Sequence, residues 1–324
     1  MAEIAVIIVN YNAAALTIDA VESVLTREHG GRSVEVHVLD NASPNGDGAL
    51  LRNAAAQRRW GARVRLHLEA KNHGFAQANN LVLSELLSRS IPPAMVFLLN
   101  PDAVLKSEAI DTLAKHLEDH PETAIAGARV ENPGECPATS AFRFPSLVSA
   151  FSEALAFGPI ARLLSRWQVP LAPKHPTAQV DWVAGCAAML RVDALREIGL
   201  FDSDFFLYFE EVELCRRART AGWQIWHVAE AEVIHIEGTA TGIKQNSRHR
   251  RPPYWYRSWA HYFRKTHGRF YALATAAAWM LGALLNLGIS KLRRRRPAAP
   301  ERLFADFWAA AGRPLLGLEA RSYE

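Results

Sequence analysis

The chain has 324 residues, of which 49% are hydrophobic and 22% are charged, and its formal net charge is +4. These values exclude a mostly disordered chain, and they allow one large α/β domain with an appendage or two domains. The charge is uneven, because residues 246–324 carry 15 Lys and Arg against four Asp and Glu, whereas residues 1–245 carry more acid than base. A basic tail on an acidic body predicts contact with an anionic partner, either nucleic acid or lipid.

The cysteine content and the N-terminus bear on the cellular compartment. Cys136, Cys186 and Cys215 form no C-x-x-C pair, which argues against a disulfide framework or a zinc site and fits a reducing compartment. The apolar run at residues 4–9 has no basic segment before it and is too short for a signal peptide. We therefore expect the body of the protein to be cytoplasmic.

Strand and helix patterns alternate along the first 130 residues. Apolar runs rich in β-branched residues predict strands, and a 3.6-residue apolar period predicts helices. Such an alternation predicts a doubly wound α/β sheet, in which ligands bind beyond the carboxyl ends of the strands. Three of those ends are polar and read VNYN, LDNAS and LNPDA. The expected strands are 4–9, 34–40, 63–69, 95–100 and 123–130, and the expected helices are 13–26, 49–60, 75–88 and 107–119.

The next hundred residues are less regular. The Pro-rich segment 131–177 predicts a long loop with one helix that could serve as a flap. Residues 180–191 predict a strand with Gly185 at its middle, and WQIWHV and AEVIHIEG predict a pair of strands. Between them, FFLYFEEVELCRRARTAGW (205–223) predicts a helix that starts near Glu210.

The acidic residues of this helix differ in their surroundings. Glu211 shares a helix face with three apolar residues, so we expect it to point toward the interior at the end of the helix nearest the cleft. Glu213 has arginines three and four positions later, the usual pattern of a surface ion pair. A purely structural alternative for Glu211 is that it complements the helix dipole.

The tail combines aromatic, basic and apolar stretches. Residues 254–270 are aromatic and basic, residues 271–290 carry no charge, and KLRRRRP follows. A spanning helix would place one basic cluster on the wrong side of a membrane. A helix lying in the cytoplasmic interface, or a re-entrant hairpin with residues 303–318, keeps both basic clusters on the cytoplasmic side. We favour surface attachment over a spanning helix. Nucleic acid fits less well, because the segment between the basic clusters is apolar. Removal of 246–324 is expected to leave the nucleotide site folded.

Seven motifs in order resemble the family 2 glycosyltransferases, and most of all the bacterial rhamnosyltransferase-type enzymes of O-antigen and cell-wall polysaccharide assembly. They are VNYN, LDNAS, NHGFAQANN, LNPDA, WVAGC, FFLYFEEVELCRRARTAGW and VIHIEG. The resemblance covers about residues 3–245 and implies a GT-A fold, an inverting transfer from a nucleotide-diphospho-sugar and a divalent metal, Mn²⁺ or Mg²⁺. It divides the chain into a GT-A domain, 1–245, and a C-terminal helical membrane-association region, 246–324.

The resemblance also assigns residues to the donor site and the metal. Asp102 and His235 would bind the metal. Asn100 stands where the family usually has the first of two aspartates, so the site has one negative charge fewer. Without the resemblance, Asp40 could be a helix cap, Asn-Pro-Asp a turn and His235 a half-buried structural residue. The implied donor-binding residues are Asn10, Tyr11, Asn12, Asp40, Asn41, Asn72, Gly74, Asn100 and Asp102.

The acceptor and the catalytic base are assigned in the same way. The family places its acceptor sugar near Trp182 and Gly185, and Glu210 is expected either beside the acceptor or in a capping role. The family has Glu-Asp where this chain has Glu210 and Glu211, and its second acid is the base. Glu211 is therefore the expected general base, with one methylene more than the family's residue.

The resulting hypothesis is an inverting hexosyltransferase of cell-surface polysaccharide synthesis. It would move a sugar, in the first instance rhamnose from dTDP-rhamnose, although a UDP-sugar is also considered, to a saccharide or polyprenyl-linked saccharide. It would act as a peripheral or monotopic protein on the inner face of the cell membrane. The alternatives are a sugar nucleotidyltransferase and a non-catalytic nucleotide-sugar-binding subunit, which Asn100 makes conceivable.

Overall fold

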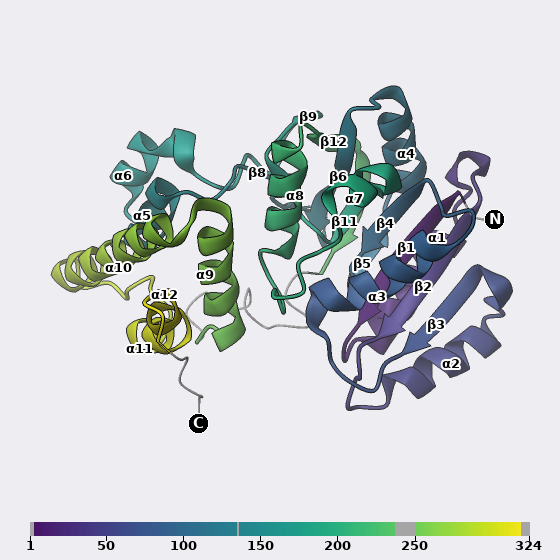
Figure 1. Cartoon of the computed structure of the whole chain (residues 1–324), viewed down its shortest axis with the longest axis horizontal. Coiled ribbons are helices and arrows are strands. Elements are labelled where there is room, and N and C mark those ends of the chain that lie inside the picture. Colours follow the sequence, from purple (N-terminus) through teal and green to yellow (C-terminus); the bar gives the residue numbers. More distant parts are fainter. Residues whose placement is uncertain (1–2, 135, 237–249, 319–324) are drawn as a thin grey trace.

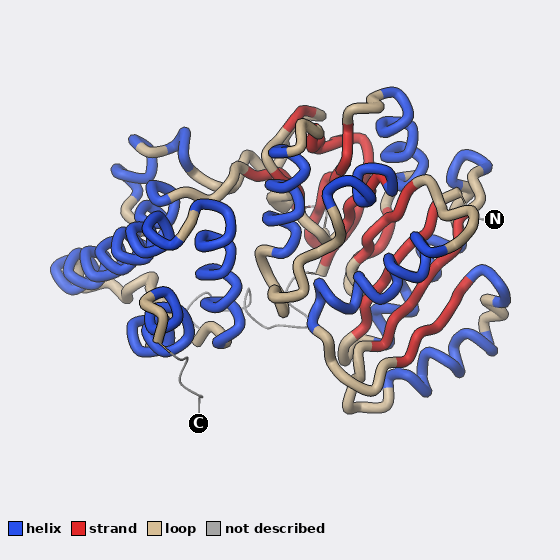
Figure 2. The backbone as a smooth tube through the Cα atoms, viewed as in Figure 1, coloured by secondary structure: helices blue, strands red, loops and turns tan. Residues whose placement is uncertain are grey.

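A computed structural model describes residues 3–134, 136–236 and 250–318. A ten-stranded mixed sheet with helices on both faces forms one end of the molecule, and a layer of helices forms the other (Figures 1 and 2). The α/β class predicted from the sequence is confirmed, and the layer of helices contains a long apolar helix, α10 (Arg269–Leu292).

The first half of the chain follows the predicted alternation. The expected strands and helices all form, with boundaries within about three residues of those expected, and β5 is an additional short strand. Short 3₁₀ turns, His29–Gly31 and Gly61–Arg63, precede two of the strands. The elements are β1 (Ile4–Asn10), α1 (Ala14–Leu25), β2 (Val34–Asp40), α2 (Asp47–Gln57), β3 (Val64–Leu68), α3 (Gly74–Ser88), β4 (Met95–Leu99), β5 (Ala103–Leu105), α4 (Ala109–Asp119) and β6 (Thr123–Asn132).

The central strands are buried on both faces. Along β1, Ala5, Ile7 and Val9 pack into one hydrophobic cluster with α3, α7 (Val192–Ile198) and α8 (Glu210–Thr220). Their neighbours along the strand point the other way, into a cluster with α1, α2 and α4. The strand order is β3-β2-β1-β4-β11-β6-β12-β5. Because β1 is parallel to both β2 and β4, the polar ends of these three strands lie at one edge of the sheet.

The predicted strand 180–191 is broken at Gly185. Its first part, β10 (Trp182–Val183), pairs with β8 (Ala141–Phe142) in a separate two-stranded sheet. Its second part, β11 (Ala187–Arg191), runs antiparallel between β4 and β6. The turn between them lets the chain leave the main sheet, so the prediction of one continuous strand is wrong.

The predicted strand pair at residues 223–238 is a single strand, β12 (Gln224–His235). It pairs with β6 on both sides of an irregularity between Val228 and Glu232, and β9 (Ala178–Gln179) pairs with its first half. A bulge has replaced the expected turn because the intervening residues include no Gly or Pro to reverse the chain. Glu237 and Gly238 of the VIHIEG motif lie outside the described residues.

Segment 131–177 is bound to the C-terminal helices and has more regular structure than predicted. It contains β7 (Cys136–Pro137), β8, α5 (Leu147–Leu155), α6 (Gly158–Leu163) and a 3₁₀ turn, Ser165–Trp167. Asn286 Nδ2 on α10 donates to the Leu155 carbonyl at 3.0 Å, and the Leu147 N–H donates to the Tyr271 hydroxyl at 3.1 Å. These bonds fix α5 at both ends, so this segment is a wall of the helical layer and not a free flap.

The C-terminal helices are continuous with the core of the body. They are α9 (Pro253–His267), α10, α11 (Leu303–Phe307), a π-helical turn (Trp308–Gly312) and α12 (Arg313–Leu315). Tyr256, Tyr262 and Phe263 of α9 are fully buried in the same cluster as Phe205 of the body. The predicted boundary at 245/246 lies outside the described residues, but α9 clearly belongs to the packed core.

Candidate active site

Asn10 and Asp40, at the ends of β1 and β2, are joined by a buried polar network. Asn10 Nδ2 donates to Asp40 Oδ1 at 2.8 Å and to Asp47 Oδ2 at 3.0 Å, and Asn10 Oδ1 accepts from the Thr17 hydroxyl at 2.7 Å. The Ser43 hydroxyl donates to the same Asp40 oxygen at 2.6 Å. The Asn10 side chain therefore makes its hydrogen bonds to other protein groups, and through them it positions Asp40. No donor from the described part of the chain bonds to the second Asp40 oxygen, Oδ2.

The residues that follow β1 and β2 lie next to this polar network. Tyr11 is 36% exposed, and Asn12 adopts the left-handed backbone conformation that asparagine tolerates. The Asn12 N–H donates to Ser43 at 2.9 Å, which fixes the turn after β1 to the turn after β2. Ser43 and Asp47 were not singled out in the sequence, although both lie in the turn-rich segment NASPNGDG.

The start of α3 is held by protein groups, which changes the role predicted for Gly74. Asn41 accepts from the His73 N–H and donates to Asn72, whose side chain accepts from the Gly74 N–H. The Phe75 N–H donates to the Phe206 carbonyl at 2.7 Å. A Cβ on Gly74 would lie 2.2 Å from that same oxygen. The close approach that this glycine permits is therefore made by the loop before α8 and not by a phosphate.

Asn100, Asp102 and His235 converge beyond the ends of β4 and β12. His235 Nε2 lies 2.9 Å from Asp102 Oδ1 and 3.4 Å from Asn100 Nδ2. Burial by itself would lower the pKa of the His235 imidazole, but the adjacent Cys186 sulfur and Asp102 carboxylate raise that pKa to about 10. The Asp102 carboxylate thus holds positive charge beside it, which in this structure is the His235 imidazolium. A carboxylate and an imidazole are suitable ligands for Mn²⁺ or Mg²⁺, and Asn100 offers a neutral oxygen.

The loop that leads into α8 is strained. Tyr208 and Phe209, just before Glu210, both have positive φ angles, 71° and 70°. Two consecutive aromatic residues in the left-handed region cost on the order of 1–3 kcal/mol each, and such strain is concentrated at functional sites. The strain is held in place by packing, since Phe209 contacts the rings of Trp255 and Tyr262 on α9.

Glu210 and Glu211 begin α8 with different surroundings. Glu210 is 3% exposed and turned into the interior, so the acceptor contact predicted for it does not fit this arrangement. Burial, followed by the charge of Glu211, raises the pKa of Glu210 well above its usual value. Burial also raises the pKa of Glu211 to about 7, against the effect of backbone N–H groups. Glu211 is partly exposed, and its Oε2 has no hydrogen-bond partner among the described residues.

The turn at Gly185 connects Glu211 to the Asp102–His235 site. A Cβ on Gly185 would be in van der Waals contact with the Glu211 Cβ, at 3.5 Å. The next residue, Cys186, accepts a 2.9 Å hydrogen bond from the Asn100 N–H through its carbonyl, and its sulfur contacts His235. One short turn therefore has Glu211 on one side and the candidate metal ligands on the other.

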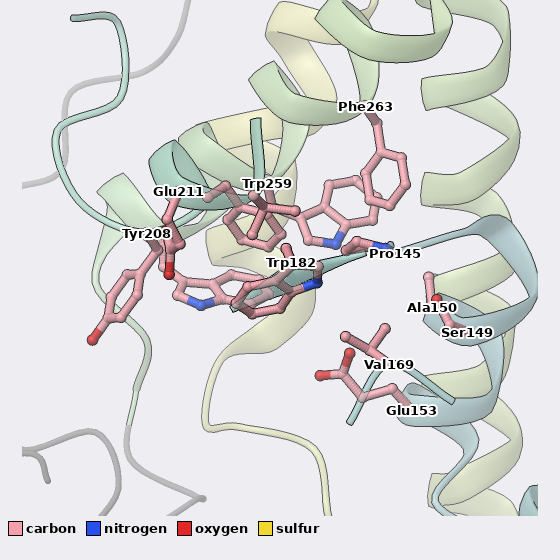
Figure 3. A pocket seen from close by; sticks show the side chains of 13 residues that line it. Pro145, Ser149, Ala150, Glu153, Val169, Trp182, Tyr208, Glu211, Trp259 and Phe263 are labelled. Atoms are coloured by element: carbon pink, nitrogen blue, oxygen red, sulfur yellow. The ribbon is translucent and has the colours of Figure 1, made fainter. Parts of the chain in front are cut away.

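Glu211 opens into a cavity of about 210 Å³ between the body and the helical layer (Figure 3). In the close view, Glu211 and Tyr208 lie at one end, Glu153 of α5 lies at the other, and the ring of Trp182 lies between them. Trp182 stacks on Phe142 with ring centroids 4.0 Å apart and donates to the Arg143 carbonyl. The helices supply wall residues that the sequence did not identify: Ser149, Ala150, Trp255, Trp259 and Phe263.

Glu213 is not the surface residue that its spacing predicted. It is 1% exposed and accepts two hydrogen bonds from Arg217 Nε, at 2.8 and 2.9 Å. Lys265 of α9 lies 3.0 Å from the same carboxylate. The predicted i,i+4 pair exists, but α9 covers it, which a helical period alone could not reveal.

A second acidic group lies at the joint between α9 and the body. Carboxylate or imidazole atoms of Asp202, Asp204 and His261 lie within 4.8 Å of one another, a geometry that could hold a metal. However, Asp202 Oδ2 is already 2.6 Å from Lys265 Nζ and 2.8 Å from His261 Nε2. Lys265 and His261 therefore already provide the positive charge that a bound metal would bring to Asp202. The group is better explained as a link between α9 and the loop before α8.

Comparison of the sequence with known proteins shows the family to which the chain belongs. The model of glycosyltransferase like family 2 matches residues 2–258. N-acetylglucosaminyl-diphospho-decaprenol L-rhamnosyltransferase of Mycobacterium tuberculosis is 30% identical over 220 residues, covering 65% of this chain and 69% of that protein. Rhamnosyltransferase WbbL of Escherichia coli is 22% identical over 165 residues, covering 50% of this chain and 61% of that protein.

A solved structure resembles the whole arrangement. The mannosyltransferase PcManGT of Pyrobaculum calidifontis, in complex with GDP-Man and Mn²⁺, has a TM-score of 0.56 at 17% identity and covers 98% of this chain and 88% of that one. The predicted GT-A fold and glycosyltransferase class are confirmed. The chain belongs to glycosyltransferase like family 2 and is a nucleotide-sugar-dependent glycosyltransferase.

Proposed function

We propose that this glycosyltransferase is an inverting enzyme and that Glu211 is its general base. The observation that carries the proposal is the position of the Glu211 carboxylate. It lies at the end of an aromatic cavity, with a pKa near neutrality and a buried oxygen, Oε2, that accepts no hydrogen bond from a described residue. A base with such a pKa can both accept and release a proton at physiological pH.

The nucleotide of the donor is proposed to bind at the ends of β1 and β2. Asp40 is fixed through one oxygen by Asn10 and Ser43, and its other oxygen can accept the imide N–H of a uracil or thymine base. The partly exposed ring of Tyr11 offers a surface for that base. This arrangement supports a UDP- or dTDP-sugar.

The diphosphate of the donor is proposed to lie over Asp102 and His235. Their side-chain atoms converge, and the Asp102 carboxylate attracts positive charge, which fits a divalent metal that would take the place of the His235 proton, with Asn100 nearby. When bound, such a metal neutralises the negative charge that develops on the leaving diphosphate. With Asn100 in place of an acid, Asp102 is the one carboxylate of this trio.

The acceptor sugar is proposed to lie in the aromatic cavity, with Trp182 beside it. An acceptor hydroxyl hydrogen-bonds to Glu211, gives its proton to that carboxylate and attacks the anomeric carbon from the side opposite the diphosphate. The new carbon–oxygen bond forms as the bond to the diphosphate breaks, which inverts the configuration. Gly185 lies beside Glu211, where a Cβ would be 3.5 Å from the Glu211 Cβ.

The substrates are proposed from the relatives. Two of them are named as rhamnosyltransferases, and the mycobacterial protein is named for a decaprenol-linked N-acetylglucosaminyl diphosphate. We propose transfer of rhamnose from dTDP-rhamnose to a polyprenyl-diphosphate-linked saccharide, on the inner face of the cell membrane. The basic, apolar C-terminal region fits such a location.

Product analysis tests the reaction. The full chain is incubated with Mn²⁺, a nucleotide sugar and polyprenyl-diphosphate-linked N-acetylglucosamine, and a thermal-shift screen first selects the nucleotide sugar. We expect free nucleoside diphosphate together with a product longer by one sugar of inverted configuration. Release of pyrophosphate would instead indicate a nucleotidyltransferase. Donor binding without turnover on any acceptor would indicate a non-catalytic subunit.

A further inference from the structure

The outer face of α10 is an exposed apolar surface that runs the length of the helix. Five large side chains on it, Phe270, Leu281, Leu284, Leu285 and Leu292, are between 44% and 87% exposed. We call these five the apolar stripe. Between Phe270 and Leu292 the other exposed positions of the helix are Ala274, Ala277 and Gly288, which are not polar, and Lys291 at its end. A continuous exposed surface of this kind on a soluble protein marks an interaction site.

The opposite face of α10 is bound to the protein. It buries Trp279, Ala283 and Asn286 together with other small or polar residues. The Asn286 side chain bonds to Leu155 of α5 at 3.0 Å and accepts from the Ala298 N–H at 3.0 Å. The helix is 24 residues long and apolar enough to cross a membrane by length and composition. Crossing would strip these bonds and put the amide in hydrocarbon, so this helix is built to have only one face in lipid.

Positive charge stands at both ends of the apolar stripe. Arg264 and Arg269 are exposed at its beginning, and Lys291 and Arg293–Arg296 are exposed at its end. A second copy of this chain would bring like charges together, whereas an anionic bilayer complements both ends at once. Near the start of α10, Arg269 Nε donates to the Leu315 carbonyl at 2.8 Å and so holds α12 there, next to the half-exposed Leu316 and Leu318.

From these observations we infer that α10 lies flat in the surface of an anionic membrane, with the apolar stripe among the acyl chains and the basic residues at the phosphates. The inference extends the proposed function, on which its catalytic meaning rests. The wall of the Glu211 cavity is built from α5 and α9, and both pack on the inner side of α10. The cavity thus lies about one helix diameter, ~10 Å, above the membrane plane, within reach of a sugar on a lipid diphosphate.

The test is flotation of the full-length protein with vesicles of phosphatidylcholine containing phosphatidylglycerol. Leu281→Gln/Leu284→Gln changes two stripe residues that are 52% and 55% exposed, and Leu50→Gln/Ile91→Gln is a control on the body with 54% and 59% exposure. We expect the stripe variant to lose at least about tenfold in vesicle partitioning and the control to bind normally. Arg294→Glu/Arg295→Glu should lose binding to anionic vesicles in the same way.

Four outcomes would overturn the inference. Two concern vesicle binding: equal binding by the stripe and control variants, and equal binding of the wild-type protein to vesicles without phosphatidylglycerol. The third is retention of the protein in the membrane after alkaline carbonate extraction, which would indicate a spanning helix. The fourth is a stripe variant that differs from wild type only in sedimenting as a smaller oligomer without vesicles, which would indicate a contact between copies of the chain. Thermal unfolding confirms that each variant is folded.

Flotation requires no turnover, so this test can fail or succeed independently of the proposed reaction. Transfer to a water-soluble acceptor should be unchanged in the stripe variant, while transfer to a vesicle-embedded lipid acceptor should fall. Stripe-dependent flotation with no transfer to either acceptor would refute the proposed reaction but support the membrane surface.

Discussion

The backbone N–H of Phe75 donates a 2.7 Å hydrogen bond to the carbonyl of Phe206, which joins the start of α3 to the loop before α8, the helix that carries Glu211. Gly74 makes this contact possible, because its φ is +72° and a Cβ would lie 2.2 Å from that carbonyl. The proposed donor site and the proposed base are therefore connected by this one contact.

Gly74→Ala should disrupt this contact and lower transfer at least about tenfold. Gly46→Ala is the matched control, because Gly46 also has a positive φ, +83°, but has nothing within 4 Å of its added Cβ. Both variants should lose about 1 kcal/mol of folding stability from the left-handed backbone. Denaturant unfolding and transfer kinetics measure the two effects. Equal activity in both variants would show that the contact does not position the base.

Asp102→Asn should abolish metal-dependent donor binding, because it removes the carboxylate that lies against His235. Asp202→Asn is the control, since Asp202 belongs to the other acidic group and is paired with Lys265. The control should unfold more easily and keep its response to Mn²⁺. Isothermal titration of UDP or dTDP with and without Mn²⁺ makes the comparison. Wild-type affinity in Asp102→Asn, or loss only in Asp202→Asn, would relocate the metal site.

Glu210→Gln should stabilise the protein at alkaline pH. Burial raises the pKa of Glu210 in the folded state above its unfolded value, so the folded state holds more protons and loses stability as pH rises. For one proton the loss is about 1.4 kcal/mol per pH unit while the unfolded carboxyl is ionised and the folded one is not. Unfolding at pH 5 and pH 8 should therefore show a larger gain for the variant at pH 8. A gain independent of pH would contradict the burial argument.

Much of the sheet could be predicted from local sequence because its signals are local. The apolar runs of β1, β2 and β4, each followed by polar residues, identified the strands and the edge where the proposed site lies. The errors arose where long-range packing decides the structure. β12 is one bulged strand because β6 pairs with both its halves, and Glu213 is buried because α9 covers it. In the same way, Trp255 and Trp259 reach the cavity only through the fold.

The contribution of α9 to the core changes the outcome expected for a truncated chain. Removal of residues 246–324 would expose Phe205 and Phe209, which α9 covers, and would remove Lys265, which pairs with Asp202 and Glu213. We expect the truncated chain to aggregate, since burial of each large apolar side chain contributes about 1.5–3 kcal/mol. Its solubility and its nucleotide-induced thermal shift measure this. A soluble fragment that still binds nucleotide would instead support the independent domain predicted from the sequence.

The central claim, that Glu211 removes the acceptor proton, is tested most directly by transfer kinetics of Glu211→Gln, which keeps the shape of the side chain and removes the proton acceptor. Donor affinity, measured in the same preparation, should stay within about twofold of wild type, and transfer should fall by at least about 10²-fold. Glu210→Gln, whose side chain does not line the cavity, should retain most of its activity. Near-normal transfer by Glu211→Gln, or a comparable loss only in Glu210→Gln, would contradict the claim.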